Sequence, residues 1–182
     1  MTDRPAPAPL VAALLAHPVL AAPAYPAPPP GPVADPAGLL AAWLLDALAA
    51  GEPDAQVVTL STLGADGHPD ARVLVLRDLE PGTAACHFWT EPDSAKARQL
   101  AAHPQAALTA YWPRQGRQAR LRGPVRPGPD CWTPSPALRC YVLHPVAVDL
   151  WQAAPDRRHL ALHAARTPDG WTPADWTAAA VD

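Results

Sequence analysis

A series of short apolar segments, separated by turn signals, most constrains the fold of this chain. Residues 57–63 (VVTLSTL) and 71–77 (ARVLVLR) have the length and composition of strands, and Ala65-Asp66-Gly67 between them is a hairpin signal. Similar segments follow at 84–90, 105–112, 117–122, 138–143 and 159–166. Residues 94–102 have helical spacing and interrupt the series. Six or so antiparallel strands with an inserted helix predict a small Greek-key barrel rather than a parallel sheet.

The N-terminal part of the chain has a different character. Residues 1–35 are rich in proline and alanine, so we treat them as an extension and residues 36–182 as one domain. Within the extension we expect a short amphipathic helix at 9–20 and an extended segment at 21–36. A second helix is expected at 39–48, because Asp35-Pro36 supplies a cap and a first-turn proline. Residues 146–150 are expected to form a short helix or an extended piece.

Charge and cysteine content exclude some classes of function. The net charge of -3 argues against a nucleic-acid-binding surface, which normally has a basic excess. No apolar run approaches the length of a membrane span, so we expect no membrane association. The three cysteines lie far apart without CxxC spacing, which favours a cytoplasmic location.

Cationic and hydroxyl residues lie at the ends of the expected strands and at the start of the expected helix. Arg72 and Arg77 bracket an apolar run and, five positions apart, point to opposite faces of a regular strand. The run between them is apolar on both faces, so it needs cover on both sides, as in a barrel wall or a subunit interface. Ser94 and Lys96 begin the helical segment, whose free N–H groups favour an anion.

Several of these segments resemble one known family. VVTLSTLGADGHPDARVLVLR, FWTEPDSAKARQLAAHP, AALTAYWPRQGRQARLRGPV, VDLWQAAPDRRH and DGW occur in the order typical of the pyridoxamine 5′-phosphate oxidase family. The resemblance covers about residues 55–118 and 141–171. It implies a mainly β fold with helices, namely a six-stranded antiparallel Greek-key split β-barrel of the FMN-binding type. It also implies a homodimer with FMN bound at the subunit interface.

The resemblance assigns roles to individual residues. It implies that Arg72 contacts the FMN phosphate, that Ser94 and Lys96 match a phosphate-binding turn, and that Gln118 lies near the isoalloxazine ring. The full set implied for FMN is Arg72, Val73, Leu74, Val75, Leu76, Trp89, Thr90, Ser94, Lys96, Gln118 and Trp151. For the substrate it implies Arg77, Arg157 and His159, with Arg157 and His159 as the catalytic pair above the substrate ring.

The chain departs from the family pattern at three places. Ala95 replaces an arginine beside Lys96, and Ala161 replaces an arginine that normally contacts the flavin. Only a short segment connects Val125 to Leu138, where the family has several dozen residues that carry most of the clamp for the substrate phosphate. These departures argue against ordinary pyridoxamine phosphate oxidation.

We therefore expect an FMN-dependent oxidase that acts on an amine or alcohol of a small cyclic substrate, with oxygen as acceptor. One alternative is a split barrel that has lost catalysis and serves as a binding dimer, and another is a split barrel for a deazaflavin or haem. Trp89 and Trp151 fit flavin contacts and core positions equally well, whereas Trp112 is assigned to the core. His159 and His163 are four apart, but on a strand and without a third ligand they do not predict a metal site.

Overall fold

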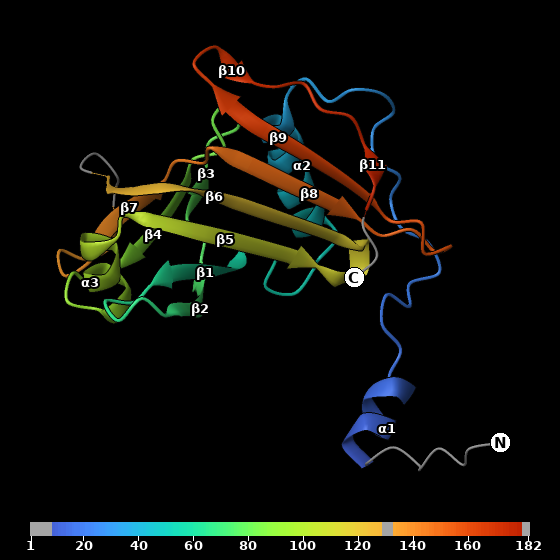
Figure 1. The fold of residues 1–182 in the computed structure, drawn as a ribbon, viewed down its shortest axis with the longest axis horizontal. Helices are drawn as coiled ribbons and strands as arrows, with labels where there is room; N and C mark the ends of the chain where they lie inside the picture. The colour runs from blue at the N-terminus through green and yellow to red at the C-terminus, as the bar shows by residue number, and fades with distance from the viewer. Residues whose placement is uncertain (1–8, 129–132, 180–182) are drawn as a thin grey trace.

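A computed structural model describes residues 9–128 and 133–179, and in it an antiparallel sheet curls around one hydrophobic core (Figure 1). The curled part contains β1 (Val57–Leu63), β2 (Pro69–Val75), β3 (Asp78–Leu79), β4 (Cys86–Thr90), β5 (Gln105–Trp112), β6 (Arg117–Pro127) and β7 (Arg139–Leu143). β1 pairs with β2 and β5, β6 pairs with β5 and β7, and β4 pairs with β7 and β3. The N–H of Arg77 donates to the carbonyl of His87 at 2.8 Å, which joins the end of β2 to β4.

This pairing confirms the predicted fold class. Because β3 continues β2, the curled sheet has six antiparallel members, and α3 (Ala95–Ala102) carries the chain from β4 across to β5, beside β1. That crossing is the Greek-key step. The predicted strands 57–63 and 105–112 are confirmed residue for residue as β1 and β5.

β6 is longer than predicted, and it has two different partners along its length. Residues 117–122 pair with β8 (Ala147–Gln152), whereas residues 125–127 pair with β7. The change of partner falls at Gly123, where a side chain would collide with the carbonyl of His144. Since β8 pairs on both sides, with β6 and β9 (Leu160–Thr167), residues 147–150 are in the extended conformation, one of the two expectations for residues 146–150. The short strands β10 (Gly170–Trp171) and β11 (Thr177–Ala178) complete the sheet.

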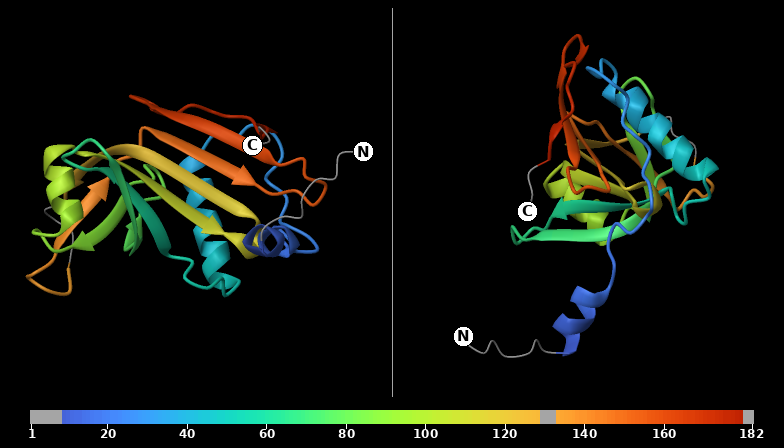
Figure 2. Two further views of the ribbon diagram at one scale, coloured as in Figure 1. Left: turned by 60° about the horizontal axis from the view of Figure 1, so that its bottom comes forward. Right: turned by 90° about the vertical axis from the view of Figure 1, so that its right-hand side faces the viewer.

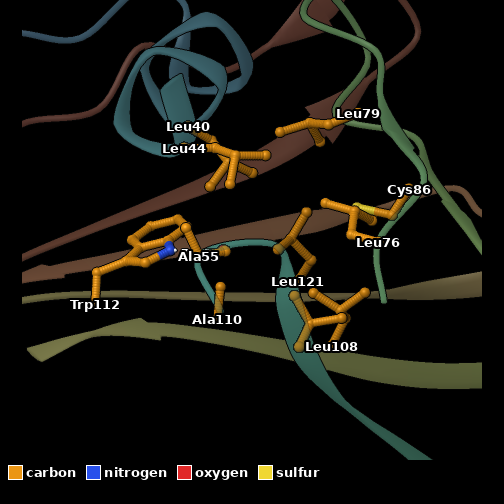
Figure 3. A pocket seen from close by; sticks show the side chains of 11 residues that line it. Leu40, Leu44, Ala55, Leu76, Leu79, Cys86, Leu108, Ala110, Trp112 and Leu121 are labelled. Carbon is orange, nitrogen blue, oxygen red and sulfur yellow. Dashed lines mark hydrogen bonds between the residues drawn. The ribbon is translucent and has the colours of Figure 1, made fainter. Parts of the chain in front are cut away.

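α2 (Pro36–Ala49) covers the core, as the views in Figures 1 and 2 show. Asp35 caps this helix by accepting the N–H of Gly38 at 2.8 Å. Leu40 and Leu44 face Leu121 and Trp112 of the barrel across a gap of only about 10 Å³ (Figure 3). A gap of this size, lined by apolar side chains, can hold at most a single water molecule. The centre of the barrel is therefore core, and the site lies elsewhere.

The described part of the extension begins with α1 (Pro9–Ala16), which projects away from the barrel and buries none of its residues (Figures 1 and 2). The predicted helix at 9–20 is thus shorter, since His17-Pro18 follows its end. Residues 17–35 carry no helix or longer strand, and Val33 makes a two-way backbone bridge with Ala174. Among the described helices, none combines the length and hydropathy needed to cross a membrane. The division at residue 35 stays a prediction.

Candidate functional site

A cavity of about 1030 Å³ lies over β5, β6, β8 and β9 on the outer face of the sheet. It brings together four residues that the sequence analysis assigned to the site: Gln118, Trp151, Arg157 and His159. Its described lining comprises Leu20, Tyr111, Gln118, Arg120, Asp149, Leu150, Trp151, Arg157, His159, Ala161, Leu162, His163, Thr177 and Ala179.

The register of the strands explains why these residues meet. Residues that lie directly opposite each other in antiparallel strands point to the same face. Tyr111 is opposite Gln118, Gln118 is opposite Trp151, and Trp151 is opposite Ala161. These four side chains form one row across the cavity floor, which we call the Trp151 row. Burial raises the pKa of the Tyr111 hydroxyl, so Tyr111 is a neutral hydrogen-bonding group in this row.

Arg157 and His159 reach the cavity from the loop between β8 and β9. Arg157 has a φ of 65°, in the left-handed region, and its N–H donates to the carbonyl of Ala154 at 3.0 Å. The Nδ1 atom of His159 accepts the N–H of Ala154 at 3.0 Å, and the ring lies 4.8 Å from the ring of Trp151. An Nδ1 that accepts carries no proton, so His159 is neutral and presents Nε2–H as a donor.

A second row, one step along the strands, was not predicted. Arg120 is opposite Asp149, and Asp149 is opposite His163. The Nδ1 of His163 lies 2.7 Å from Oδ1 of Asp149, and the Arg120 guanidinium lies 3.8 Å from Oδ2. We call these three residues the Arg120 row. On β9, His163 is two residues from Ala161 and shares its face, but sequence spacing alone does not give the register that brings it opposite Asp149.

The other predicted cofactor residues lie in a different part of the chain. Arg72 donates to Thr62 Oγ1 at 2.5 Å, to Gln99 Oε1 at 3.0 Å and to Asp70 Oδ2 at 2.5 Å. Hydrogen bonds from Gln99 and the charge of Arg72 hold the pKa of Asp70 below its usual value. Arg72 is therefore tied to β1 and α3, with its positive charge partly compensated by a carboxylate.

Thr90, Ser94 and Lys96 lie around the start of α3. Ser94 caps the helix by accepting the N–H of Ala97 at 3.3 Å, and its hydroxyl lies 3.0 Å from that of Thr90. Lys96 follows in the first turn, and Ala95 contributes no donor beside it. The predicted start of this helix is confirmed, and the two hydroxyl groups lie at its positive end, with Lys96 in the first turn.

Arg77 and Trp89 form a further pair. The Arg77 guanidinium lies 4.5 Å above the Trp89 ring, on the outward side of β4. Leu74 and Leu76 pack on the core, but Val73 remains 70% exposed. The run between Arg72 and Arg77 thus has cover on one face only. Trp112, by contrast, is a core residue as predicted, and its Nε1 donates to the carbonyl of Ala55 at 2.9 Å.

The structure separates the predicted site residues into a cavity group, a group around α3 and the Arg77–Trp89 pair. Gln118, Trp151, Arg157 and His159 share the cavity, whereas Arg72, Thr90, Ser94 and Lys96 surround α3. Within the described part of the chain, the hydrogen bonds of the Arg72 and Ser94 side chains stay among β1, β2, β4 and α3. One copy of the chain therefore holds a cationic group and a ring-lined cavity as separate features.

Comparison with known proteins identifies a family. The family model described as pyridoxamine 5′-phosphate oxidase matches residues 44–166. The pyridoxine/pyridoxamine 5′-phosphate oxidase of Nitrobacter hamburgensis is 42% identical over 96 residues, which are 53% of this chain and 44% of that protein. The enzyme of the same description from Azorhizobium caulinodans is 43% identical over 91 residues, which are 50% of this chain and 42% of that protein. The match thus spans less than half the length of these curated relatives.

Solved structures share the fold. PhzG from Burkholderia lata 383, solved in complex with tetrahydrophenazine-1-carboxylic acid, superposes with a TM-score of 0.74 at 20% identity, over 86% of this chain and 100% of that one. A pyridoxamine 5′-phosphate oxidase-related, FMN-binding protein from Nostoc punctiforme PCC 73102 gives a TM-score of 0.63 at 19% identity, over 81% of this chain and 97% of that one. At these identities the two structures establish the split-barrel fold.

Proposed function

Because the chain belongs to the pyridoxamine 5′-phosphate oxidase family, we propose that it is an FMN-dependent oxidase. It oxidises an amine or alcohol on a small cyclic substrate, and oxygen is the final acceptor. The observation that carries this proposal is the cavity over β5, β6, β8 and β9, where Gln118, Trp151, Arg157 and His159 converge. Its volume of about 1030 Å³ suits a flavin and a substrate together.

The residues around α3 fit the phosphate of FMN in their chemistry. A guanidinium, an ammonium and a hydroxyl at a helix start are suitable donors for a phosphate dianion, and Arg72, Lys96 and Ser94 supply them. Asp70, which is paired with Arg72, does not suit an anion, but its side chain is half exposed and can turn away. When bound, FMN supplies a hydride acceptor that oxygen regenerates.

The cavity residues have distinct tasks in this proposal. Trp151 and Gln118 bind the flavin ring, one by contact with its face and the other by hydrogen bonding. His159, fixed as an Nε2–H donor, and Arg157 orient the substrate so that the reacting carbon faces the flavin. Arg77, on its own part of the chain, provides a further cation for an acidic substrate.

The departures from the family pattern weaken the expected FMN contacts, and they favour a substrate other than the phosphorylated vitamer. Ala95 and Ala161 each remove a charged donor, and a charged hydrogen bond contributes about 1.5–3 kcal/mol. Losing both donors, about 3–6 kcal/mol in total, makes FMN binding about a hundredfold to ten-thousandfold weaker than with both donors present. Residues 128–138 form the whole connection between β6 and β7, which is too short to add the helices of a vitamer-phosphate clamp. Of that clamp, Arg77 remains.

The separation of the two residue groups supports a homodimer with FMN at the interface. The outer face of β1, β2 and β5 carries small or apolar side chains, including Val73, Ala71, Ala107 and Tyr111. A second copy placed against this face brings one subunit's α3 toward the partner's cavity. We expect Val73→Asp to dissociate the dimer in sedimentation experiments and to weaken FMN binding with it. A monomeric protein that binds FMN at full affinity would contradict this arrangement.

The visible absorption spectrum of the purified protein tests the proposal most directly. We expect a flavin spectrum, or its appearance when FMN is added, together with a rise in the melting temperature. A colourless protein that FMN does not stabilise would refute the FMN assignment and favour the non-catalytic alternative. A haem or deazaflavin spectrum would instead identify another flat cofactor. Release of peroxide with any amine or alcohol would exclude the non-catalytic alternative. The cytoplasmic location of the protein stays a prediction.

A further inference from the structure

We propose that Arg120, which lies in the Arg120 row with Asp149 and His163, binds the acidic group of the substrate, and that this group is a carboxylate on an aromatic ring. The inference rests on the proposed function and extends it, because neither Arg120 nor His163 belongs to the residue set carried over from the family. All three side chains lie on the floor of the cavity beside the Trp151 row.

The spacing of the two rows suits a substituted ring. Arg120 is two residues from Gln118 on β6, and Asp149 is two residues from Trp151 on β8. Two residues along a strand span about 7 Å. A ring that lies against Trp151 therefore places a substituent on its edge beside Arg120.

The contacts of Asp149 leave Arg120 able to bind a ligand. Oδ1 of Asp149 is engaged by His163 Nδ1 at 2.7 Å, which holds the carboxylate in place. The distance of 3.8 Å from Oδ2 to the Arg120 guanidinium is too long for a direct hydrogen bond. Arg120 is also largely exposed, so its N–H groups remain available for the forked pairing that carboxylates accept.

The charge of the lining selects the kind of acid. Among the described lining residues, Arg120 and Arg157 are positive and Asp149 is negative. His159 is neutral, because its Nδ1 accepts a backbone N–H. Within the Arg120 row the Asp149 carboxylate offsets one positive charge, so the row carries at most one net positive charge. A carboxylate neutralises that charge, whereas a phosphate ester dianion leaves an excess of negative charge.

Three probes of equal ring size test this inference on protein saturated with FMN: 1-naphthoate, 1-naphthamide and 1-naphthyl phosphate. We expect isothermal titration to show that the carboxylate binds at least about tenfold more tightly than the neutral amide, and more tightly than the phosphate. Equal affinities for carboxylate and amide, or tightest binding of the phosphate, would overturn the inference.

Single variants test whether the Arg120 row causes the preference for the carboxylate probe. Arg120→Gln should abolish the preference for carboxylate and leave amide binding unchanged, whereas Arg122→Gln should keep the preference. Arg122 is the matched control, since it points to the same face of β6 but lies outside the cavity. Asp149→Asn should keep or strengthen carboxylate binding, because it removes the only negative charge among the described lining residues. A carboxylate preference that survives Arg120→Gln, or is lost in Arg122→Gln or Asp149→Asn, would refute the assignment.

The visible spectrum recorded before each titration separates this inference from the proposed function. If the protein takes up no FMN, the proposed function fails on that measurement alone. The same titrations on the cofactor-free protein then decide whether the Arg120 row selects a carboxylate. A carboxylate preference that depends on Arg120 supports the row in either case, and its absence refutes it.

Discussion

Arg117→Met tests how the helix α2 is fixed to the barrel. The side chain of Arg117 is only 6% exposed, and its guanidinium lies 3.0 Å from Asp46 of α2 and 3.2 Å from Gln152 Oε1 of β8. It also lies 4.7 Å above the ring of Trp43, which is buried in the same helix. One cation therefore joins the helix to β6 and β8, two of the four strands that carry the cavity.

The magnitude follows from what each substitution leaves behind. Methionine fills the space of the arginine stem, but it leaves the buried Gln152 Oε1 without its donor, at about 1–3 kcal/mol, and removes the contact with Trp43, at about 1 kcal/mol. We therefore expect a loss of about 2–4 kcal/mol in the free energy of unfolding. Asp46→Asn should cost about 1 kcal/mol or less, since Asp46 is 59% exposed and solvent screens its charge.

Urea denaturation followed by circular dichroism measures both losses. The double variant should be no less stable than Arg117→Met alone, because Asp46 then has no partner to lose. A cost of Arg117→Met below about 0.5 kcal/mol would mean that the barrel tolerates an apolar residue there, as some buried ion pairs do. A larger cost for Asp46→Asn than for Arg117→Met would also contradict the reasoning.

Three further predictions concern single positions. Asp70→Asn should tighten FMN binding by a factor of about two to five, because Asp70 competes with the phosphate for Arg72; weaker binding in a fluorescence titration would contradict this. Burial raises the pKa of the Cys86 thiol to about 12, so the folded state keeps a proton that the unfolded state releases above about pH 9. The free energy of unfolding should therefore fall by about 1 kcal/mol between pH 9 and pH 10. In urea titrations, Cys86→Ala should remove this fall in the free energy of unfolding between pH 9 and pH 10. An unchanged dependence on pH would argue against the reasoning. Gly116→Ala should lower the free energy of unfolding by about 1–3 kcal/mol, since φ is 59° and the new Cβ would lie 2.6 Å from that of Ala153. An unchanged stability in thermal melts would refute the close contact.

Local signals predicted most of the fold. β1 and β5 agree with their predicted ranges because their alternating apolar residues end at strong turns. The end of β6 was placed too early, at Arg122, because Gly123-Pro124 looks like a break in a single sequence. In the structure Pro124 lies where the strand changes partner, so its missing N–H does no harm.

The site residues could be predicted only where they belong to a sequence segment that resembles the family. The cavity gathers Gln118, Trp151, Arg157 and His159 as a single set. Arg120 and His163 were missed, because a cross-strand neighbour depends on register, which sequence spacing alone does not determine. The Arg117–Asp46 pair likewise joins positions 71 residues apart and has no local signature.

The two-partner strand β6 has a consequence for how the protein opens. Its first half forms part of the cavity floor, and its second half pairs with β7 in the barrel. Detaching β8 and β9 exposes one edge of β6 while the other edge stays paired with β5. Amide protons of β8 and β9 should therefore exchange with solvent long before those of β5 and β6. The cavity side of the sheet then opens while the barrel stays closed.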